Sequence, residues 1–223
     1  MRALITQRED RNRYGNPTDV LEIDYIRFYE KLGLQLQLQP VSNFTCSLRT
    51  IFKEHWDLLV VVGGGALNPE YYDRPHNEER QYNRDAIEEF LIRYCLDNQV
   101  PIVGTCRGMQ HINALLGGSL TYHPNYPVNR PLGTDHMVHF LKEDKWVQVN
   151  NYHYDCIYRE QLAPGLIPLA MDEENSVVEA FTNESGTILG VQWHPERYVD
   201  SEEDWVYVRD MIRDFIRNGH IEV

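Results

Sequence analysis

The stretch Pro101-Ile-Val-Gly-Thr-Cys-Arg-Gly-Met-Gln110 decides the fold of this chain. Its short apolar run predicts a buried strand, and the amphipathic residues from Met109 to Leu116 predict a helix that follows it. Cys106 stands between them with a glycine two positions away on either side, which is the cysteine form of the nucleophile elbow. Such a corner exposes the side chain at the carboxyl edge of a sheet. It also places the sulfur at a helix amino terminus, where the helix dipole favours a thiolate.

A base for this nucleophile is found far downstream, in the segment Gln192-Trp-His-Pro-Glu196. This segment directly follows a predicted strand, and open α/β sheets build their sites at the carboxyl ends of strands. His194 can take the thiol proton and later protonate the leaving nitrogen, and Glu196 can hold the imidazole ring in one tautomer. Pro195 predicts an irregular turn between them. Cys106, His194 and Glu196 therefore form a candidate catalytic triad.

Predicted strands and helices alternate along the first half of the chain, which is typical of a parallel sheet. We expect strands at 2–6, 34–39, 57–62 and 102–104, helices at 19–32, 47–55, 84–97 and 107–116, and loops at 7–16 and 66–83. Short strands follow at 137–141, 146–149, 166–170, 177–181 and 188–191, before a closing helix at 204–216. The pattern predicts a doubly wound, mostly parallel α/β sheet flanked by helices, with a small β-rich insert. The length suits a single domain over residues 1–223.

Several segments resemble the class I glutamine amidotransferases, in the branch that hydrolyses γ-glutamyl amides such as γ-glutamyl-γ-aminobutyrate. The similarity runs from about Asp57 to Glu196, and the amino-terminal segment matches only loosely. The paired elbow and Gln-Trp-His-Pro-Glu motifs are its specific part. The other matching segments are Val60-Val-Val-Gly-Gly-Gly65, Val149-Asn-Asn-Tyr-His153, Leu162-Ala-Pro-Gly-Leu166 and Val178-Glu-Ala180.

The resemblance implies a role for each residue that matches a family motif. It makes Cys106 the nucleophile, His194 the base and Glu196 the orienting carboxylate. The implied oxyanion donors are the backbone N–H groups of Gly64 and Arg107, and the side chain of Arg107 is expected in packing and salt bridges. The residues implied in substrate binding are Gln110, Asn151, Tyr152 and His153. Two departures lie in this substrate segment and bear on the leaving group: Asn151 replaces the usual serine, and Tyr154 stands where a second histidine is common.

The activity that the resemblance implies is cysteine-dependent hydrolysis of a γ-glutamyl amide. Glutamate and an amine would be released through a γ-glutamyl thioester, with no metal and no organic cofactor. One alternative is a glutaminase subunit that supplies ammonia to a separate synthetase partner. Another is a catalytically dead binding protein that retains the fold, and the intact triad argues against it.

Three arginines follow the first predicted strand, so their loop is expected at the same sheet edge as Cys106. The guanidinium groups of Arg8, Arg11 and Arg13 could grip a phosphate or carboxylate on the leaving group. A phosphorylated or nucleotide-linked leaving group, of the γ-glutamyl-CDP-amidate type, is therefore one hypothesis. The alternative is a solvated loop in which Glu9 and Asp10 neutralise the arginines.

The composition limits the partners of the chain. A formal net charge of −13 argues against non-specific binding to nucleic acid or to anionic membranes. No apolar run approaches ~18 residues, and the start lacks the pattern of a signal peptide. The 14 tyrosines could line a homodimer interface.

The cysteines and histidines outside the triad predict no further chemistry. The four cysteines show no C-x-x-C spacing, so reduced thiols in a cytoplasm are expected, and Cys46, Cys95 and Cys156 are interpreted as structural. His136 and His139 form an H-x-x-H pair on a predicted strand. That spacing directs the two rings to opposite faces, which argues against a metal site.

Overall fold

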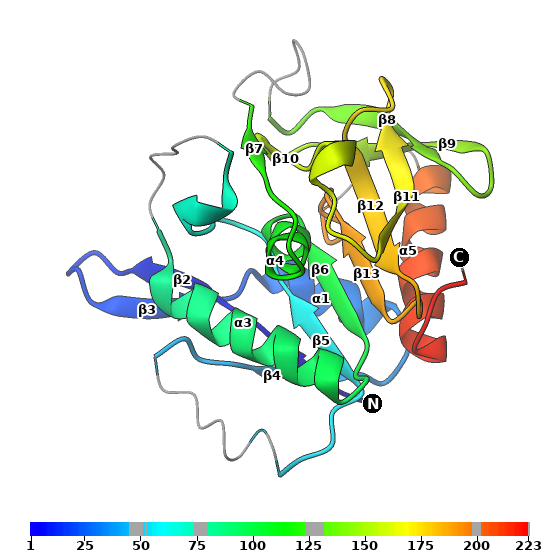
Figure 1. Cartoon of the computed structure of the whole chain (residues 1–223). Coiled ribbons are helices and arrows are strands. Elements are labelled where there is room, and N and C mark those ends of the chain that lie inside the picture. Colours follow the sequence, from blue (N-terminus) through cyan, green and yellow to red (C-terminus); the bar gives the residue numbers. More distant parts are fainter. Residues whose placement is uncertain (45–50, 52, 74–79, 124–131, 198–201, 223) are drawn as a thin grey trace.

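The computed structural model describes residues 1–44, 51, 53–73, 80–123, 132–197 and 202–222. A nine-stranded sheet forms the centre of the molecule, with helices on both of its faces (Figure 1). Its strands are β1 (Arg2–Ile5), β4 (Gln37–Pro40), β5 (Leu58–Val61), β6 (Ile102–Thr105), β8 (Asp135–Phe140), β9 (Lys145–Asn150), β11 (Leu166–Asp172), β12 (Val178–Asn183) and β13 (Ile188–Val191). The helices are α1 (Ile23–Lys31), α3 (Tyr82–Asp97), α4 (Arg107–Leu115) and α5 (Glu202–Asn218), with short 3-10 turns η1 (Pro69–Tyr71) and η2 (Arg159–Gln161).

The order of strands in the sheet is β4-β1-β5-β6-β13-β12-β11-β8-β9. The strands from β4 to β13 pair in parallel. Those from β12 to β9 extend the same sheet in antiparallel fashion. Strands β5, β6 and β13 are buried along their whole length, as apolar strands covered on both faces must be. The site described below lies at the carboxyl ends of these three strands.

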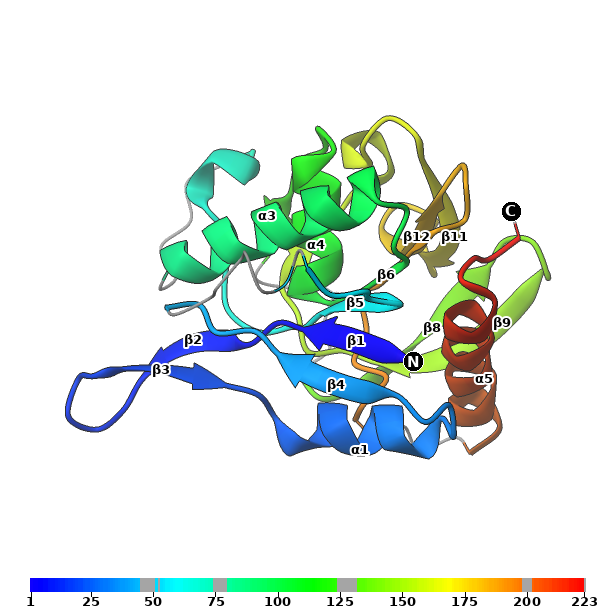
Figure 2. The same ribbon diagram turned by 90° about the horizontal axis from the view of Figure 1, so that it is seen from below.

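Among the helices that the structure describes, α1 and α5 cover one face of the sheet and α3 and α4 cover the other, which confirms the doubly wound α/β fold (Figure 2). Phe28 of α1 and Phe215 of α5 pack in the hydrophobic core on one face. Leu91 of α3 and Ile112 of α4 pack in the core on the other. The two cores together hold the central strands rigidly, so the loops at their carboxyl ends have fixed starting points.

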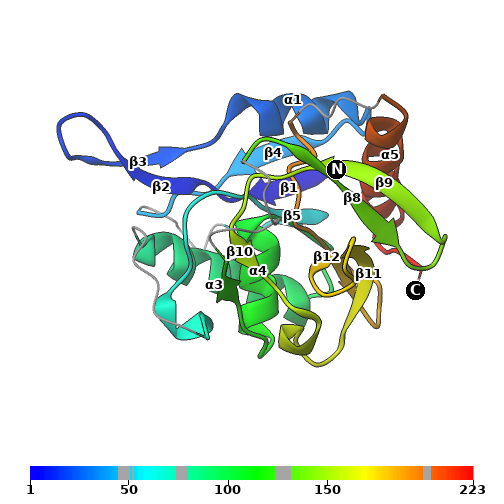
Figure 3. The ribbon, with the colours of Figure 1, turned by 90° about the horizontal axis from the view of Figure 1, so that it is seen from above.

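The segment predicted as a loop over 7–16 contains a strand instead. Strand β2 (Arg8–Arg11) pairs antiparallel with β3 (Pro17–Val20), and this hairpin extends away from the body of the molecule (Figure 3). Because β3 occupies residues up to Val20, the helix predicted from residue 19 begins only at Ile23. Strand β2 reads Arg-Glu-Asp-Arg and lacks the apolar alternation by which strands are recognised.

The predicted β-rich region between residues 120 and 193 mostly joins the main sheet. Strands β8, β9, β11 and β12 lie beside the parallel strands, while β7 (Thr121–Tyr122) and β10 (Asp155–Cys156) form a separate antiparallel pair. On β8 the burial alternates, so that His136 is buried and His139 stacks on the half-exposed ring of Trp146. The two histidines therefore lie on opposite faces, as predicted.

Other boundaries differ modestly from the predicted ones. The strand predicted over 34–39 is observed over Gln37–Pro40, because Gln35 adopts a φ of 50° and interrupts the extended backbone. Most of the helix predicted over 47–55, together with Cys46, lies outside the described residues. Among the helices that the structure describes, none combines the length and the apolar character needed to cross a bilayer.

Candidate active site

Cys106 sits at a tight corner between β6 and α4. Its backbone has φ 51° and ψ −111°, a conformation that is strained for a residue with a Cβ. A Cβ on Gly104 would lie 2.6 Å from Cδ1 of Ile112, and one on Gly108 would lie 2.1 Å from the carbonyl oxygen of Val61. Both glycines are thus required by close contact, because the helix must start directly against the neighbouring strand.

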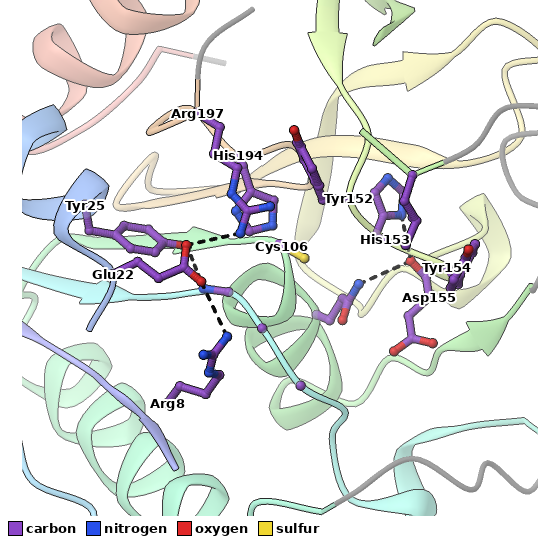
Figure 4. Close-up of a pocket in the computed structure, with 15 residues that line it drawn as sticks. Arg8, Glu22, Tyr25, Cys106, Tyr152, His153, Tyr154, Asp155, His194 and Arg197 are labelled. Carbon is purple, nitrogen blue, oxygen red and sulfur yellow. Dashed lines mark hydrogen bonds and ion pairs between the residues drawn. The ribbon is translucent and has the colours of Figure 1, made fainter. Parts of the chain in front are cut away.

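The pairing of β6 with β13 brings His194 to this corner. Thr105 lies opposite Val191, and the N–H of Cys106 donates to the carbonyl of Val191 at 2.8 Å. The imidazole of His194 makes a side-chain hydrogen bond with Cys106, and its Nδ1 lies 2.6 Å from Oε1 of Glu196. All three side chains are at least nine-tenths buried, at 7%, 3% and 8% exposure in sequence order. The structure therefore brings the predicted triad together, and Figure 4 shows Cys106 and His194 of this triad at the pocket.

Asn150 fixes the backbone of the histidine. Its Oδ1 accepts the N–H of His194 at 2.9 Å, and its Nδ2 donates to the carbonyl of His194 at 2.8 Å. Asn150 ends β9, which lies at the far edge of the sheet from the nucleophile. The sequence signal for this contact is weak, since an asparagine at a strand end is ordinary.

The surroundings of His194 favour the protonated form of its imidazole. Burial lowers the pKa of His194, but the Cys106 thiolate and the Glu196 carboxylate outweigh burial and raise it to about 10. The imidazole is therefore protonated at neutral pH while it faces the sulfur. A protonated imidazole beside the sulfur can serve as the acid catalyst for a cysteine nucleophile.

Tyr25 links the triad to the glycine loop. Its hydroxyl accepts the N–H of Gly63 at 2.9 Å and donates to the carboxylate of Glu196. Burial and the Glu196 charge raise the pKa of Tyr25 well above its usual range, so the phenol stays neutral and keeps its proton for Glu196. The sequence predicts Tyr25 only as a core residue of a helix, and its polar role depends on a tertiary contact.

Arg84 holds the other side of the glycine loop. Its buried guanidinium donates to three successive carbonyls, those of Val62 at 2.5 Å, Gly63 at 3.1 Å and Gly64 at 2.6 Å. In a planar trans peptide group the carbonyl and the N–H of the following residue point in opposite directions. A carbonyl that points at Arg84 therefore directs the N–H of the following residue away from the guanidinium. The conformation of the loop is thus set by one side chain of α3.

A buried charge network connects this loop to the residue after the nucleophile. Oε1 of Glu88 lies 2.6 Å from Nε of Arg84, and Oε2 of Glu88 pairs with Arg107. Arg107 also pairs with Asp85. Burial raises the pKa of Glu88, but the two arginines outweigh it and hold it well below its usual range. His111 Nδ1 adds a contact at 2.9 Å to Glu88. Two guanidinium groups thus face two carboxylates, and the predicted salt-bridge role of the Arg107 side chain is confirmed.

A cavity of about 250 Å³ opens over Cys106. Its lining is Arg8, Glu22, Tyr25, Gly63, Gly64, Gly65, Cys106, Gln110, Leu132, Tyr152, His153, Tyr154, Asp155, His194 and Arg197. Gln110 closes one end, where its Nε2 donates to the carbonyl of Asp155 at 3.2 Å and to Oε1 of Gln192 at 3.1 Å. Burial, as the largest influence, lowers the pKa of His153 to about 4, so this ring is neutral at neutral pH.

The opposite end of the cavity is charged. Glu22 lies between two arginines, with Oε1 3.4 Å from Arg8 and Oε2 3.1 Å from Arg197. The guanidinium of Arg197 lies over the ring of Tyr152, 4.3 Å from its centroid. The sequence predicts Arg8 and Tyr152 at the site. Glu22 and Arg197 belong to segments that carry no motif of their own.

Three residues that the sequence analysis assigns to substrate contacts do not line the cavity over Cys106. Asn151 is completely buried and stands behind the cavity wall. Arg11 lines a neighbouring pocket, not the cavity over Cys106. Arg13 lines neither pocket: it lies beyond β2, near the turn of the hairpin, with its guanidinium over the exposed ring of Tyr14.

The fold and the site define a hydrolase of the class I glutamine amidotransferase type. The chain belongs to the peptidase C26 family, whose sequence profile matches residues 2–196. It is 33% identical over 186 residues to NtpR of Enterococcus hirae, covering 74% of this chain and 75% of that one. It is 28% identical over 194 residues to the γ-glutamyl-CDP-amidate hydrolase of Campylobacter jejuni, with 86% and 88% covered. The crystal structure of a Thermotoga maritima glutamine amidotransferase superposes with a TM-score of 0.58 at 18% identity, covering 97% and 84%.

The elbow predicts a large loss of stability on substituting Gly108. Gly108→Ala should lower the free energy of unfolding by about 3 kcal/mol, because the added Cβ meets a strand carbonyl that cannot move aside. Gly117→Ala, at the other end of α4, is the control. Nothing lies within 4 Å of a Cβ there, so only its φ of 99° is penalised, by about 1 kcal/mol. Denaturant unfolding that gives equal losses for both variants would contradict this account of the corner.

The charge state of His194 is testable by nuclear magnetic resonance. Its imidazole nitrogens should report a protonated ring throughout the neutral range, because its pKa is raised to about 10. In Cys106→Ser the interaction of the sulfur with the imidazole is lost while burial remains, so the pKa of His194 should fall below the wild-type value. Cys95→Ala, which removes a buried thiol from α3, should leave it unchanged. An unaltered His194 titration in Cys106→Ser would show that the sulfur of Cys106 does not raise the pKa of the ring.

Proposed function

We propose that this protein hydrolyses γ-glutamyl amides and releases glutamate and an amine. The observation that carries the proposal is the buried contact chain from Cys106 through His194 to Glu196, at the mouth of a cavity lined by a glycine loop. Membership of the peptidase C26 family supports the same reaction class. The cysteine is the nucleophile, the histidine moves protons, and the glutamate orients the ring.

The reaction proceeds in two displacement steps. The Cys106 thiolate attacks the γ-carbonyl carbon, and a tetrahedral oxyanion forms. His194 gives its proton to the nitrogen as the C–N bond breaks, which leaves a γ-glutamyl thioester and a free amine. His194 then takes a proton from water as the water attacks the thioester carbon. The C–S bond breaks, glutamate leaves, and the thiolate faces an imidazolium again.

The oxyanion would be held by two backbone donors. Helix α4 begins at Arg107, and the first N–H groups of a helix have no acceptor within the helix. The second donor is the N–H of Gly64, which the bond from Arg84 to the carbonyl of Gly63 turns away from the buried guanidinium. Donors fixed in this way stabilise charge that develops only in the transition state.

The acyl part of the substrate is assigned to the Gln110 end of the cavity. There Gln110, Tyr152 and His153 line the wall, together with the backbone at Asp155. Asn151 acts from behind, through an Oδ1 that accepts the N–H of His153 at 3.3 Å. Amide and carbonyl groups at this end suit the α-amino and α-carboxylate groups of glutamate.

The reaction chemistry alone does not identify the leaving amine. A phosphorylated or nucleotide-linked amine is a narrower version of the proposal. It is supported by the name of the Campylobacter jejuni relative and by Arg8 in the lining of the cavity. A glutaminase subunit would use the same chemistry on glutamine, with ammonia as the leaving group. A panel of γ-glutamyl compounds that includes glutamine separates these cases.

Removal of the nucleophile tests the proposal. Cys106→Ala should lower glutamate release from every active member of the panel by at least about a thousandfold, because no thioester can form. Cys95→Ala is the matched control, since it removes a buried thiol outside the site and should retain activity. Circular dichroism should show both variants folded. Undiminished turnover in the folded Cys106→Ala protein would refute the mechanism.

Arg84 should act on catalysis through the glycine loop. A lysine cannot donate to three carbonyls at once, so Arg84→Lys should lower kcat by about ten- to a hundredfold with little change in KM, as expected when oxyanion donors are displaced. Arg93→Lys alters an exposed pair with Glu89 on the same helix and should change neither constant. A rise in KM at constant kcat would mean that Arg84 serves binding and not the oxyanion loop.

A further inference from the structure

The peptide group that joins Val62 to Gly63 is held from both faces of the sheet. Its carbonyl oxygen, which belongs to Val62, accepts a hydrogen bond from Nη2 of Arg84 at 2.5 Å. Its N–H, which belongs to Gly63, donates to the hydroxyl of Tyr25 at 2.9 Å. Arg84 belongs to α3 and Tyr25 to α1, and these helices cover opposite faces of the sheet. Two side chains therefore fix the plane of one peptide group from opposite directions.

The α-carbon that follows this peptide group packs against the triad. A Cβ built on Gly63 would lie 2.7 Å from Cε1 of His194 and 3.2 Å from the Cβ of Cys106. Gly63 is therefore part of the surface on which the imidazole ring rests. A rotation of the Val62–Gly63 peptide group would change that surface, so the orientation of the peptide group and the position of the ring depend on each other.

The hydroxyl of Tyr25 reaches the triad by a second contact. It makes a side-chain hydrogen bond with Glu196, whose Oε1 lies 2.6 Å from Nδ1 of His194. A neutral phenol can accept from Gly63 and donate to a carboxylate at the same time, because it has one proton and two lone pairs. Figure 4 shows the Tyr25 side chain extending from α1 toward the pocket that Cys106 and His194 line. One hydroxyl thus joins the orienting carboxylate of the triad to the glycine loop.

We propose that Tyr25 is a positioning residue for the reaction, and that Tyr25 and Arg84 together form a clamp on the Val62–Gly63 peptide group. The clamp aligns the glycine loop with the imidazole of His194, so that the oxyanion donor at Gly64 and the proton of the ring meet the same substrate carbon. Tyr25 acts through Gly63 and Glu196, and needs no contact with the reacting atoms. This inference rests on the proposed function, because it assigns a residue to that reaction.

The same helix supplies a matched control. Tyr29 lies one turn after Tyr25 on α1 and is equally buried, at 2% exposure against 3%. In the part of the chain that the structure describes, the hydroxyl of Tyr29 has no hydrogen-bond partner. Tyr25→Phe and Tyr29→Phe therefore remove the same atom from the same helix. They differ in the contacts that the lost hydroxyl makes with the loop and the triad.

Steady-state kinetics on an active γ-glutamyl amide tests the positioning role. Tyr25→Phe should lower kcat by about tenfold and leave KM within about twofold, because the lost hydrogen bonds orient groups that act in the transition state. Tyr29→Phe should keep both constants. Equal effects of the two substitutions, or a rise in KM at constant kcat for Tyr25→Phe, would overturn the proposal.

A double-variant cycle tests whether Tyr25 and Arg84 hold the same peptide group. Once one side of the clamp is lost, the other side orients the peptide group less well, so the two losses should not multiply. Tyr25→Phe combined with Arg84→Lys should retain at least about threefold more kcat than the product of the single losses allows. Tyr29→Phe combined with Arg84→Lys should match Arg84→Lys alone. Losses that multiply in the Tyr25 pair would contradict the clamp.

Hydrogen exchange adds a readout that needs no turnover. By nuclear magnetic resonance, the amide of Gly63 should exchange slowly in the wild-type protein and at least about tenfold faster in Tyr25→Phe, while Tyr29→Phe leaves it unchanged. A wild-type protein that releases no glutamate from any γ-glutamyl compound would overturn the proposed function, whatever the exchange of Gly63 shows. Normal glutamate release with an equally protected Gly63 amide in both phenylalanine variants would overturn the clamp alone.

Discussion

The parallel pairing of β6 with β13 is the constraint on which the site depends. It sets Gly104 opposite Gly190 and Thr105 opposite Val191, so the residues that follow each strand must meet at one sheet edge. Both strands are fully buried between two helical layers, and a shift of register would move every side chain to the other face. The same packing that stabilises the fold thereby places a sulfur against an imidazole.

The second requirement is a rigid glycine loop, and here charge takes the place of apolar packing. A buried network of two arginines and two carboxylates ties the carbonyls of Val62, Gly63 and Gly64 to the side chain of Arg107. Buried ion pairs contribute little net stability, because desolvation offsets attraction, but loss of one partner is costly. Such a network therefore fixes geometry, and it joins the two proposed oxyanion donors through α3.

Much of this arrangement is predictable from the sequence because it is local. The elbow and the His-Pro-Glu turn each combine a strand end with residues of defined chemistry, and the structure places both at the carboxyl ends of β6 and β13. Other residues of the site act through contacts between distant segments, and the periodicity of the sequence does not reveal such contacts. These residues are Tyr25, Arg84, Asn150 and Glu22. The sequence does not predict the hairpin of β2 and β3, because strand β2 is charged and the hairpin is ordered by strand pairing and by the contact of Glu9 with α3. The sequence predicts the antiparallel half of the sheet as an insert, because the sequence of a short strand does not show which strand it pairs with.

The most direct test of this account is mass spectrometry of the protein quenched by acid during turnover of a γ-glutamyl amide. The account predicts a peptide containing Cys106 that carries one γ-glutamyl group, attached by a bond that hydroxylamine cleaves. The adduct should appear with the first turnover and decay as substrate is exhausted. Sustained release of glutamate with Cys106 unmodified at every time point, or with the adduct on another residue, would contradict it.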